Sequence, residues 1–258
     1  MSREMLNTFR HRWGGLLLLA LLLGAWEAAA RGLGLSALVL PPPSAVGLAL
    51  AKGLASGYFW PHIAATVTAL LLGLALGCAV GFGAGVLLAE VAPLRRVLMP
   101  YVIVSQVVPK LALMPLFIVW FGFGLLPTVV ITALICFFPL METTLTGLAG
   151  VPPERIELFR MLGASRLRTL WRLKLPSGLP SVLAGLRIAV VLALVGAVVG
   201  EFIGASRGLG ALIIAAQGSM DTPLMFAVLV LIAALGLMLY AATALLERRL
   251  LRPYVHLH

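Results

Sequence analysis

Charged residues are scarce in this chain. Of its 258 residues, 11% are Asp, Glu, Lys or Arg and 62% are hydrophobic, whereas a soluble domain carries about 25% charged residues. So large an apolar share cannot be buried in one globule, which excludes a soluble domain and predicts an all-α polytopic membrane protein. Cys78 and Cys136 lie in apolar runs without paired spacing, and the four histidines are scattered. These counts favour neither a metal site nor a redox motif.

Acidic residues are scarcer than basic ones, with 9 Asp and Glu against 19 Lys and Arg and a formal net charge of +10. Such a surplus is also found in nucleic-acid-binding proteins. Membrane proteins, however, collect Lys and Arg in their cytoplasmic loops, because positive flanks resist translocation. This second explanation accounts for the charge without a polyanion, so we expect no nucleic-acid partner.

In place of charged residues, the chain contains long apolar stretches. Six of them can cross about 30 Å of hydrocarbon as helices at 1.5 Å per residue, and they occupy residues 13–30, 62–90, 97–121, 125–141, 178–204 and 223–246. If the amino terminus is cytoplasmic, most Lys and Arg fall in cytoplasmic segments, and only Arg31, Lys52 and Arg207 fall in external ones. The positive-inside rule therefore predicts that both termini are cytoplasmic.

The spans and their short connections use up the chain, which predicts a single transmembrane domain over residues 1–258 with its core spans at 62–246. The external segment after the first span begins with Pro41, Pro42, Pro43 and Ser44. Prolines favour extended chain at such a start. The mildly amphipathic residues 45–54 then predict a short interfacial helix.

Glycines recur at every fourth position in two of the predicted spans. They are Gly73, Gly77, Gly81 and Gly85 in the second span, and Gly196, Gly200 and Gly204 in the fifth. Small residues at this spacing share one helix face and let membrane helices approach closely. The pattern favours packing within one subunit over a seam between two copies.

The third span contains Pro109 and Pro115, each of which removes a backbone donor and is expected to distort the helix. Broken spans are tolerated only where protein or a water-filled cavity satisfies the freed backbone groups. Ser105, Gln106 and Lys110 lie at this break. They are therefore candidates for the wall of a pathway through the membrane.

A structured basic segment, residues 151–180, interrupts the apolar sequence. Pro152 and Pro153 suit the first turn of a helix, and Glu154 and Glu157 lie near its positive end. Gly163 is suited to the left-handed conformation that ends a helix.

Ala164 and Ser165 are then expected to start a second helix, which Pro176 would stop, with Pro180 in the first turn of the fifth span. An amphipathic surface helix held on anionic lipid is the alternative. The glycine turn and the proline exit are more structure than lipid adhesion requires.

The run from Glu157, ELFRMLGASRLRTLWRLKLPSGLP, resembles the EAA loop of bacterial ABC importer permeases. That pattern is Glu-Ala-Ala, three residues, Gly, and Leu-Pro a dozen or so residues later. The chain departs from it at Leu158 and Phe159, where the family usually has alanines. Residues 109–122, PKLALMPLFIVWFG, are similar to the third span of the taurine, nitrate and sulfonate permeases.

The resemblance implies a fold of about six transmembrane helices like that of type I ABC importers, with a cytoplasmic coupling loop over residues 142–177. It also implies a homodimer in the bacterial inner membrane that takes a small solute, such as taurine, a sulfonate, nitrate or bicarbonate, from a separate binding protein. The coupling helix would enter a groove of the ATPase subunit. The residues expected to take part in coupling are Glu154, Glu157, Phe159, Arg160, Gly163, Ala164, Ser165 and Pro176.

The chain has no G-x-x-x-x-G-K-[ST] motif, so a separate ATPase chain is expected to hold ATP and Mg²⁺, and this chain is expected to be non-catalytic without a cofactor of its own. A secondary transporter driven by an ion gradient is the main alternative, but the break in the third span has no evident counterpart in the other half. A membrane enzyme would need convergent acid, base or metal-binding side chains, which the pattern lacks.

Three charged residues are candidates for the translocation path. Lys110 either attracts an anionic solute or pairs with Glu142, Glu201 or a backbone carbonyl, since charges within spans usually find a partner. Glu201 lies near the outer end of the fifth span. It either gates the outer mouth, or contacts the binding protein, or is an interfacial carboxylate exposed to water.

Overall fold

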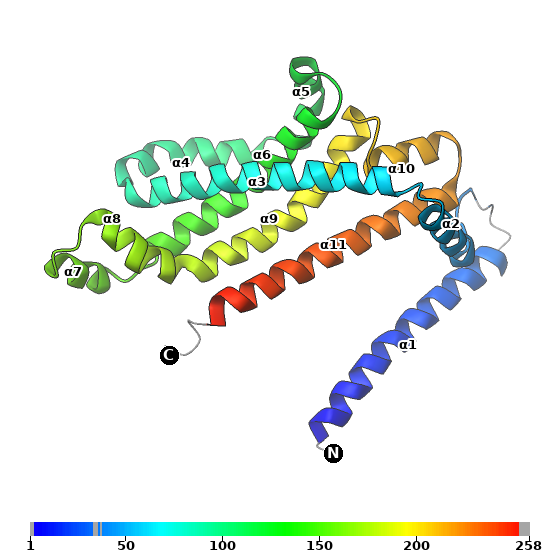
Figure 1. The fold of residues 1–258 in the computed structure, drawn as a ribbon, viewed down its shortest axis with the longest axis horizontal. Coiled ribbons are helices and arrows are strands. Elements are labelled where there is room, and N and C mark those ends of the chain that lie inside the picture. The colour runs from blue at the N-terminus through cyan, green and yellow to red at the C-terminus, as the bar shows by residue number, and fades with distance from the viewer. Residues whose placement is uncertain (1–2, 33–35, 37, 253–258) are drawn as a thin grey trace. The chain divides into compact units, whose positions relative to one another are not determined.

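The computed structural model describes residues 3–32, 36 and 38–252, and that part of the chain contains helices and no strand. This confirms the all-α prediction. The elements in chain order are α1 (Arg3–Gly32), α2 (Pro43–Ala55), α3 (Trp60–Glu90), α4 (Ala92–Val107), the 3₁₀ helix η1 (Lys110–Leu113), α5 (Met114–Phe121), α6 (Leu125–Ala149), α7 (Pro153–Met161), α8 (Arg166–Thr169), the π-helical segment η2 (Leu170–Lys174), α9 (Leu175–Gly204), α10 (Leu209–Gly218) and α11 (Thr222–Leu251) (Figure 1).

Four described helical segments are long and apolar enough to cross a membrane: α3, α6, the continuous segment Arg166–Gly204, and α11. The pair formed by α4 and the segment Lys110–Phe121 would count as a fifth span, bent by 82° at its break. The predicted first span, residues 13–30, lies within α1, which is not among these segments. Six crossings therefore stay a prediction.

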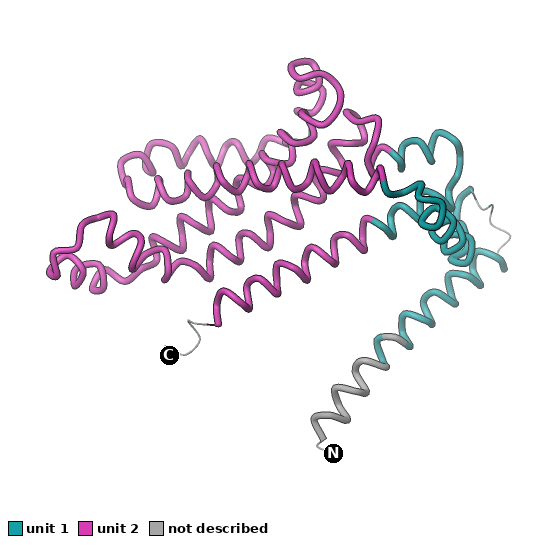
Figure 2. The backbone as a smooth tube through the Cα atoms, viewed as in Figure 1, with its two compact units in different colours: residues 1–60, 212–231 teal, residues 61–211, 232–258 magenta. Residues whose placement is uncertain are grey.

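The chain divides into two compact units (Figure 2). One comprises residues 1–60 and 212–231, and the other comprises residues 61–211 and 232–258. The single domain expected over residues 1–258 stays a prediction.

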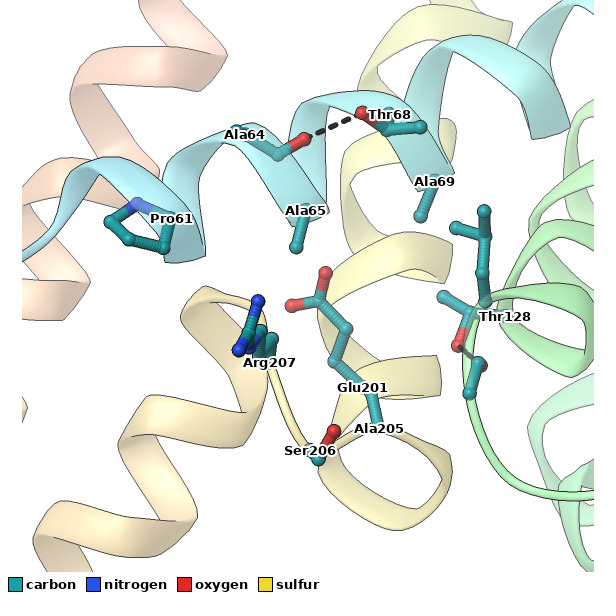
Figure 3. A pocket seen from close by; sticks show the side chains of 12 residues that line it. Pro61, Ala64, Ala65, Thr68, Ala69, Thr128, Glu201, Ala205, Ser206 and Arg207 are labelled. Carbon is teal, nitrogen blue, oxygen red and sulfur yellow. Dashed lines mark hydrogen bonds between the residues drawn. The ribbon is translucent and has the colours of Figure 1, made fainter.

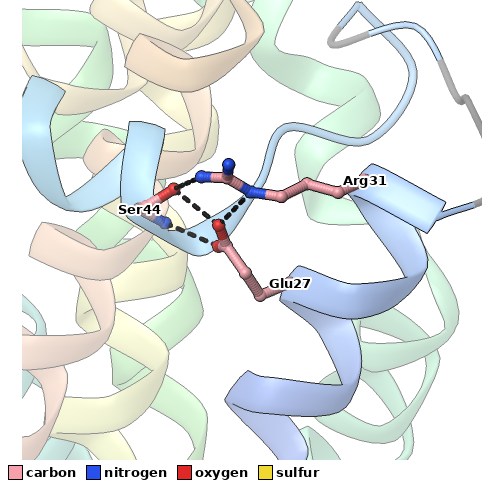
Figure 4. Close-up of polar contacts among 3 residues, drawn as sticks. All are labelled: Glu27, Arg31 and Ser44. Atoms are coloured by element: carbon pink, nitrogen blue, oxygen red, sulfur yellow. Dashed lines mark hydrogen bonds and ion pairs between the residues drawn. The ribbon is translucent and has the colours of Figure 1, made fainter.

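In the smaller unit, the end of α1 is tied to the start of α2 by three polar side chains (Figure 4). Arg31 Nε lies 2.6 Å from Glu27 Oε1, and Ser44 donates from its hydroxyl to Glu27 Oε1 and from its backbone N–H to Glu27 Oε2. Glu27 thus accepts hydrogen bonds from the first turn of α2, whose N–H groups have no partner within the helix. The short helix predicted at residues 45–54 is α2 and is confirmed.

In the larger unit, α6 packs directly on both glycine faces. A Cβ added to Gly77 or Gly81 of α3 would lie 2.5 Å from a backbone carbonyl oxygen of α6, that of Ala133 or Phe137. One added to Gly196 or Gly200 of α9 would lie 3.0 Å from an α6 atom. The glycines therefore serve close packing within one subunit, as predicted.

Fewer prolines interrupt a helix than the sequence predicts. The third span breaks at Val108 and Pro109, as predicted, but Pro115 causes no distortion, because it lies in the first turn of α5 where a missing N–H costs nothing. Pro176 does not stop the second helix of the basic segment. It lies in the first turn of α9, and the chain stays helical from Arg166 through η2 into α9.

The helices flanking the basic segment are longer than predicted. The fourth span was expected to end at residue 141, but α6 continues to Ala149. Since α9 begins at Leu175, Pro180 lies inside this helix and not in its first turn. The coupling loop was predicted over residues 142–177. Of these, residues 150–165 lie between α6 and the helical segment that leads into α9.

Candidate functional site

The basic segment forms a short rigid helix, α7, beyond the ends of α6 and α9 (Figure 1). Pro153 occupies its first turn and Glu154 lies there too. Gly163, with φ +72°, follows the last turn, as predicted. Gly163 N–H donates to Arg160 O at 3.0 Å and Ala164 N–H donates to Phe159 O at 2.9 Å. These two bonds form a Schellman motif, which satisfies carbonyl groups at the helix end and fixes the turn.

The next helix begins as the sequence predicts. Ser165 has extended backbone geometry, and its hydroxyl accepts from Arg168 N–H at 3.3 Å, which makes it the N-cap of α8. Thr169 is buried and its hydroxyl donates to Ser165 O. Because α8 runs through η2 into α9, the Gly163 turn and one continuous helical segment connect α7 to a candidate membrane span.

Among its exposed charged residues, the α7 end carries three exposed apolar side chains. No residue of α7 is buried, and Leu158, Met161 and the following Leu162 are 55%, 87% and 74% exposed. Exposed apolar side chains on a polar segment make this a candidate interaction surface. We call Leu158, Met161 and Leu162 the α7 apolar surface.

A groove of about 1020 Å³ lies between the α3–α4 turn and the segment from α7 to η2. Its charged lining residues are Glu90, Arg160, Arg166 and Lys174, and Lys174 Nζ lies 2.7 Å from Glu90 Oε1. This ion pair joins residues 84 positions apart, and sequence reasoning missed it. Both residues adjoin span ends, which is the only signal that could have suggested it.

The predicted coupling residues are distributed over several surfaces. Arg160, Ala164 and Ser165 line the groove. Glu154 and Glu157 are exposed, Phe159 is half-buried, and Pro176 lies in α9. The role of each in coupling stays a prediction.

The break in the third span places Lys110 in η1, where it is half-buried. Within the described residues, Lys110 forms no ion pair with Glu142, Glu201 or any other carboxylate. Ser105 and Gln106 are exposed on α4, and Glu142 is exposed on α6. The predicted pairing of Lys110 with Glu142 or Glu201 is therefore wrong, and among the described residues Lys110 is a cation without an ion pair at the break.

Glu201 is buried, with only 2% of its surface exposed. The prediction that it is an interfacial carboxylate exposed to water is therefore wrong. Its Oε2 accepts from Thr66 Oγ1 at 3.0 Å and from Gly210 N–H at 2.8 Å, while Thr66 Oγ1 accepts from Leu209 N–H. These bonds connect α3, the end of α9 and the first turn of α10. Gly208 approaches so closely that a Cβ there would collide with the Glu201 carboxylate.

A pocket of about 350 Å³ adjoins this cluster (Figure 3). Its lining comes from α3, α6, the end of α9 and the loop that carries Arg207, and it includes none of Ser105, Gln106, Lys110 and Glu142. The structure therefore places Glu201 in a different pocket environment from the other predicted path residues. The role of Thr66 was missed, because a threonine in an apolar helix gives no sign of a partner 135 residues away.

The chain is similar to known transport proteins over most of its length. The family model described as binding-protein-dependent transport system inner membrane component matches residues 81–252. The riboflavin transport system permease protein of Chloroflexus aurantiacus is 40% identical over 234 residues, which cover 91% of this chain and 87% of that protein. The taurine transport system permease protein of Escherichia coli is 33% identical, with 90% and 86% covered.

One solved structure supports the fold. A chain of the MetNI methionine ABC transporter in an inward-facing conformation matches with a TM-score of 0.65 and 23% identity. The match covers 75% of this chain and 94% of that chain.

Proposed function

The chain belongs to the family of binding-protein-dependent transport system inner membrane components, and from this membership we propose that two copies of it form the path by which a small solute enters the cell. It is the permease subunit of an ATP-driven importer. Relatives are named for riboflavin and taurine transport. The solute proposed here is a sulfonate, taurine, nitrate, bicarbonate or a similarly small organic molecule, delivered by a binding protein.

The observation that carries the proposal is the α7 apolar surface. It lies on a helix whose end is fixed by the Gly163 turn and which is followed by the helical segment leading into α9. A partner that holds this surface can therefore move a membrane span. We propose that the partner is an ATPase subunit, that ATP hydrolysis takes place there, and that this chain is non-catalytic.

The second copy is proposed to cover α4 and the break that follows it. No residue of α4 is buried, and Tyr101, Val104 and Val107 are 71%, 65% and 81% exposed. Lipid could cover these side chains. It could not satisfy the backbone carbonyl that loses its helical partner where Pro109 has no N–H to donate, because non-helical backbone at membrane depth must face protein or water. A homodimer with a wet path at this seam meets that requirement.

Uptake into proteoliposomes tests the proposal against the ion-gradient alternative. The chain is reconstituted with and without its ATPase subunits, and labelled solute is supplied with its binding protein. We expect uptake only with the ATPase and ATP, unchanged when ionophores collapse all ion gradients. Gradient-driven uptake by the chain alone would show that it is a secondary transporter.

Lys110 offers a second test, of the path itself. We expect Lys110→Ala to lower the uptake rate at least about tenfold, equivalent to ~1.4 kcal/mol, because an unpaired cation at the break attracts a polar solute. Lys110→Arg keeps the charge and should retain most of the rate. Uptake is measured at equal amounts of assembled complex, and an unchanged rate for Lys110→Ala would remove Lys110 from the path.

A further inference from the structure

The groove beneath α7 has an excess of positive charge. Three cations, Arg160, Arg166 and Lys174, line it together with one carboxylate, Glu90. Lys174 is paired with Glu90, whereas neither Arg160 nor Arg166 forms an ion pair with any carboxylate in the described part of the chain. Two guanidinium groups are therefore available at one concave site, and their planar donor pairs match phosphate oxygens.

We propose that this groove binds the phosphate group of an anionic phospholipid of the cytoplasmic leaflet. The groove is at the level where spans end, because Glu90 is the last residue of α3 and Ala92 the first of α4. Lipid phosphates lie at this level of a bilayer. Basic pockets between spans on the cytoplasmic side are known to hold anionic headgroups.

The remaining lining suits the rest of a lipid. Val91, Ala92 and Pro93 from the α3–α4 turn and Ile156 from α7 supply apolar contacts beside the two arginines. A free phosphate ion would use the guanidinium groups but not this apolar part. The combination of cations and apolar residues at a span end thus favours a phospholipid over an inorganic anion.

The groove and Leu158 of the α7 apolar surface lie on opposite sides of α7. Ile156 and Arg160, four residues apart, share the face that lines the groove. Leu158 is two residues from each of them, or about 200° around the helix at about 100° per residue. An ATPase subunit that contacts α7 on the side of Leu158 would therefore leave the groove open to lipid.

Native mass spectrometry of the importer complex provides the test. The complex is mixed with phosphatidylglycerol or phosphatidylcholine of identical acyl chains, and the retained lipid is counted. We expect phosphatidylglycerol to be retained at least about tenfold more than phosphatidylcholine, equivalent to ~1.4 kcal/mol. The double variant Arg160→Gln and Arg166→Gln should lose this preference.

Arg168 and Arg172 supply the matched control, since both are exposed in the same basic segment but do not line the groove. Arg168→Gln with Arg172→Gln removes the same charge and should keep the preference. Equal loss in both double variants would mean non-specific attraction, and no loss in either would place the lipid elsewhere. Displacement of phosphatidylglycerol by inorganic phosphate, with no effect of sulfate, would assign the groove to a free phosphate ion. Each of these three results overturns the proposal.

Discussion

Gly81→Leu is expected to remove most of the correctly folded protein, whereas Gly83→Leu two residues away in α3 should leave its amount nearly unchanged. A Cβ at Gly81 would lie 2.5 Å from Phe137 O, and a backbone atom inside α6 cannot move aside. Overpacking of a well-packed core costs about 1–3 kcal/mol and sometimes more. A leucine adds three further carbon atoms at the same contact, so we expect a loss at or above the upper end of that range.

Gly83 provides the control because it is exposed and a Cβ there meets nothing within 4 Å. The measurements are the yield of monodisperse protein in detergent and its thermal unfolding temperature. If the Gly83 variant were lost and the Gly81 variant kept, the exposed side of α3 would have to contact another subunit, and the packing of α3 on α6 would not determine stability.

Met161→Glu combined with Leu162→Glu is expected to abolish coupled transport without unfolding the permease. Both side chains are largely exposed, at 87% and 74%, and exposed substitutions usually change stability by about 0.5 kcal/mol or less. Two carboxylates in an apolar contact with the ATPase would each have to be desolvated without a partner. We expect uptake to fall at least about a hundredfold, which corresponds to ~2.8 kcal/mol.

The matched control keeps the apolar character and the approximate volume at the same two positions. Met161→Leu with Leu162→Met should transport at close to the original rate, since such exchanges are well tolerated. Co-purification of the ATPase, its ATP hydrolysis and solute uptake are measured for both double variants. Normal uptake by the carboxylate variant would exclude the α7 apolar surface from coupling.

Local features were predictable where a residue type has one strong backbone preference. Gly163 has the positive φ expected for a helix end, and Ser165 caps the following helix. Pro109 is adjacent to the break in the third span. Pro115 and Pro176 were wrongly expected to disrupt helices, because whether a proline does so depends on which turn of the helix it occupies. That position depends on where each helix begins, which single-sequence patterns locate poorly.

The amino-acid sequence by itself determined the class of this protein, because its long apolar runs can be accommodated only as helices in a membrane. The four-residue spacing of its glycines also determined that α3 and α9 each have one face for close packing. Only the tertiary structure decided that α6 packs on both faces, that Glu201 is buried against Thr66 and Gly210, and that Lys174 pairs with Glu90. Helix periodicity is a property of neighbouring residues. A contact across 84 or 135 positions depends on how whole helices are arranged.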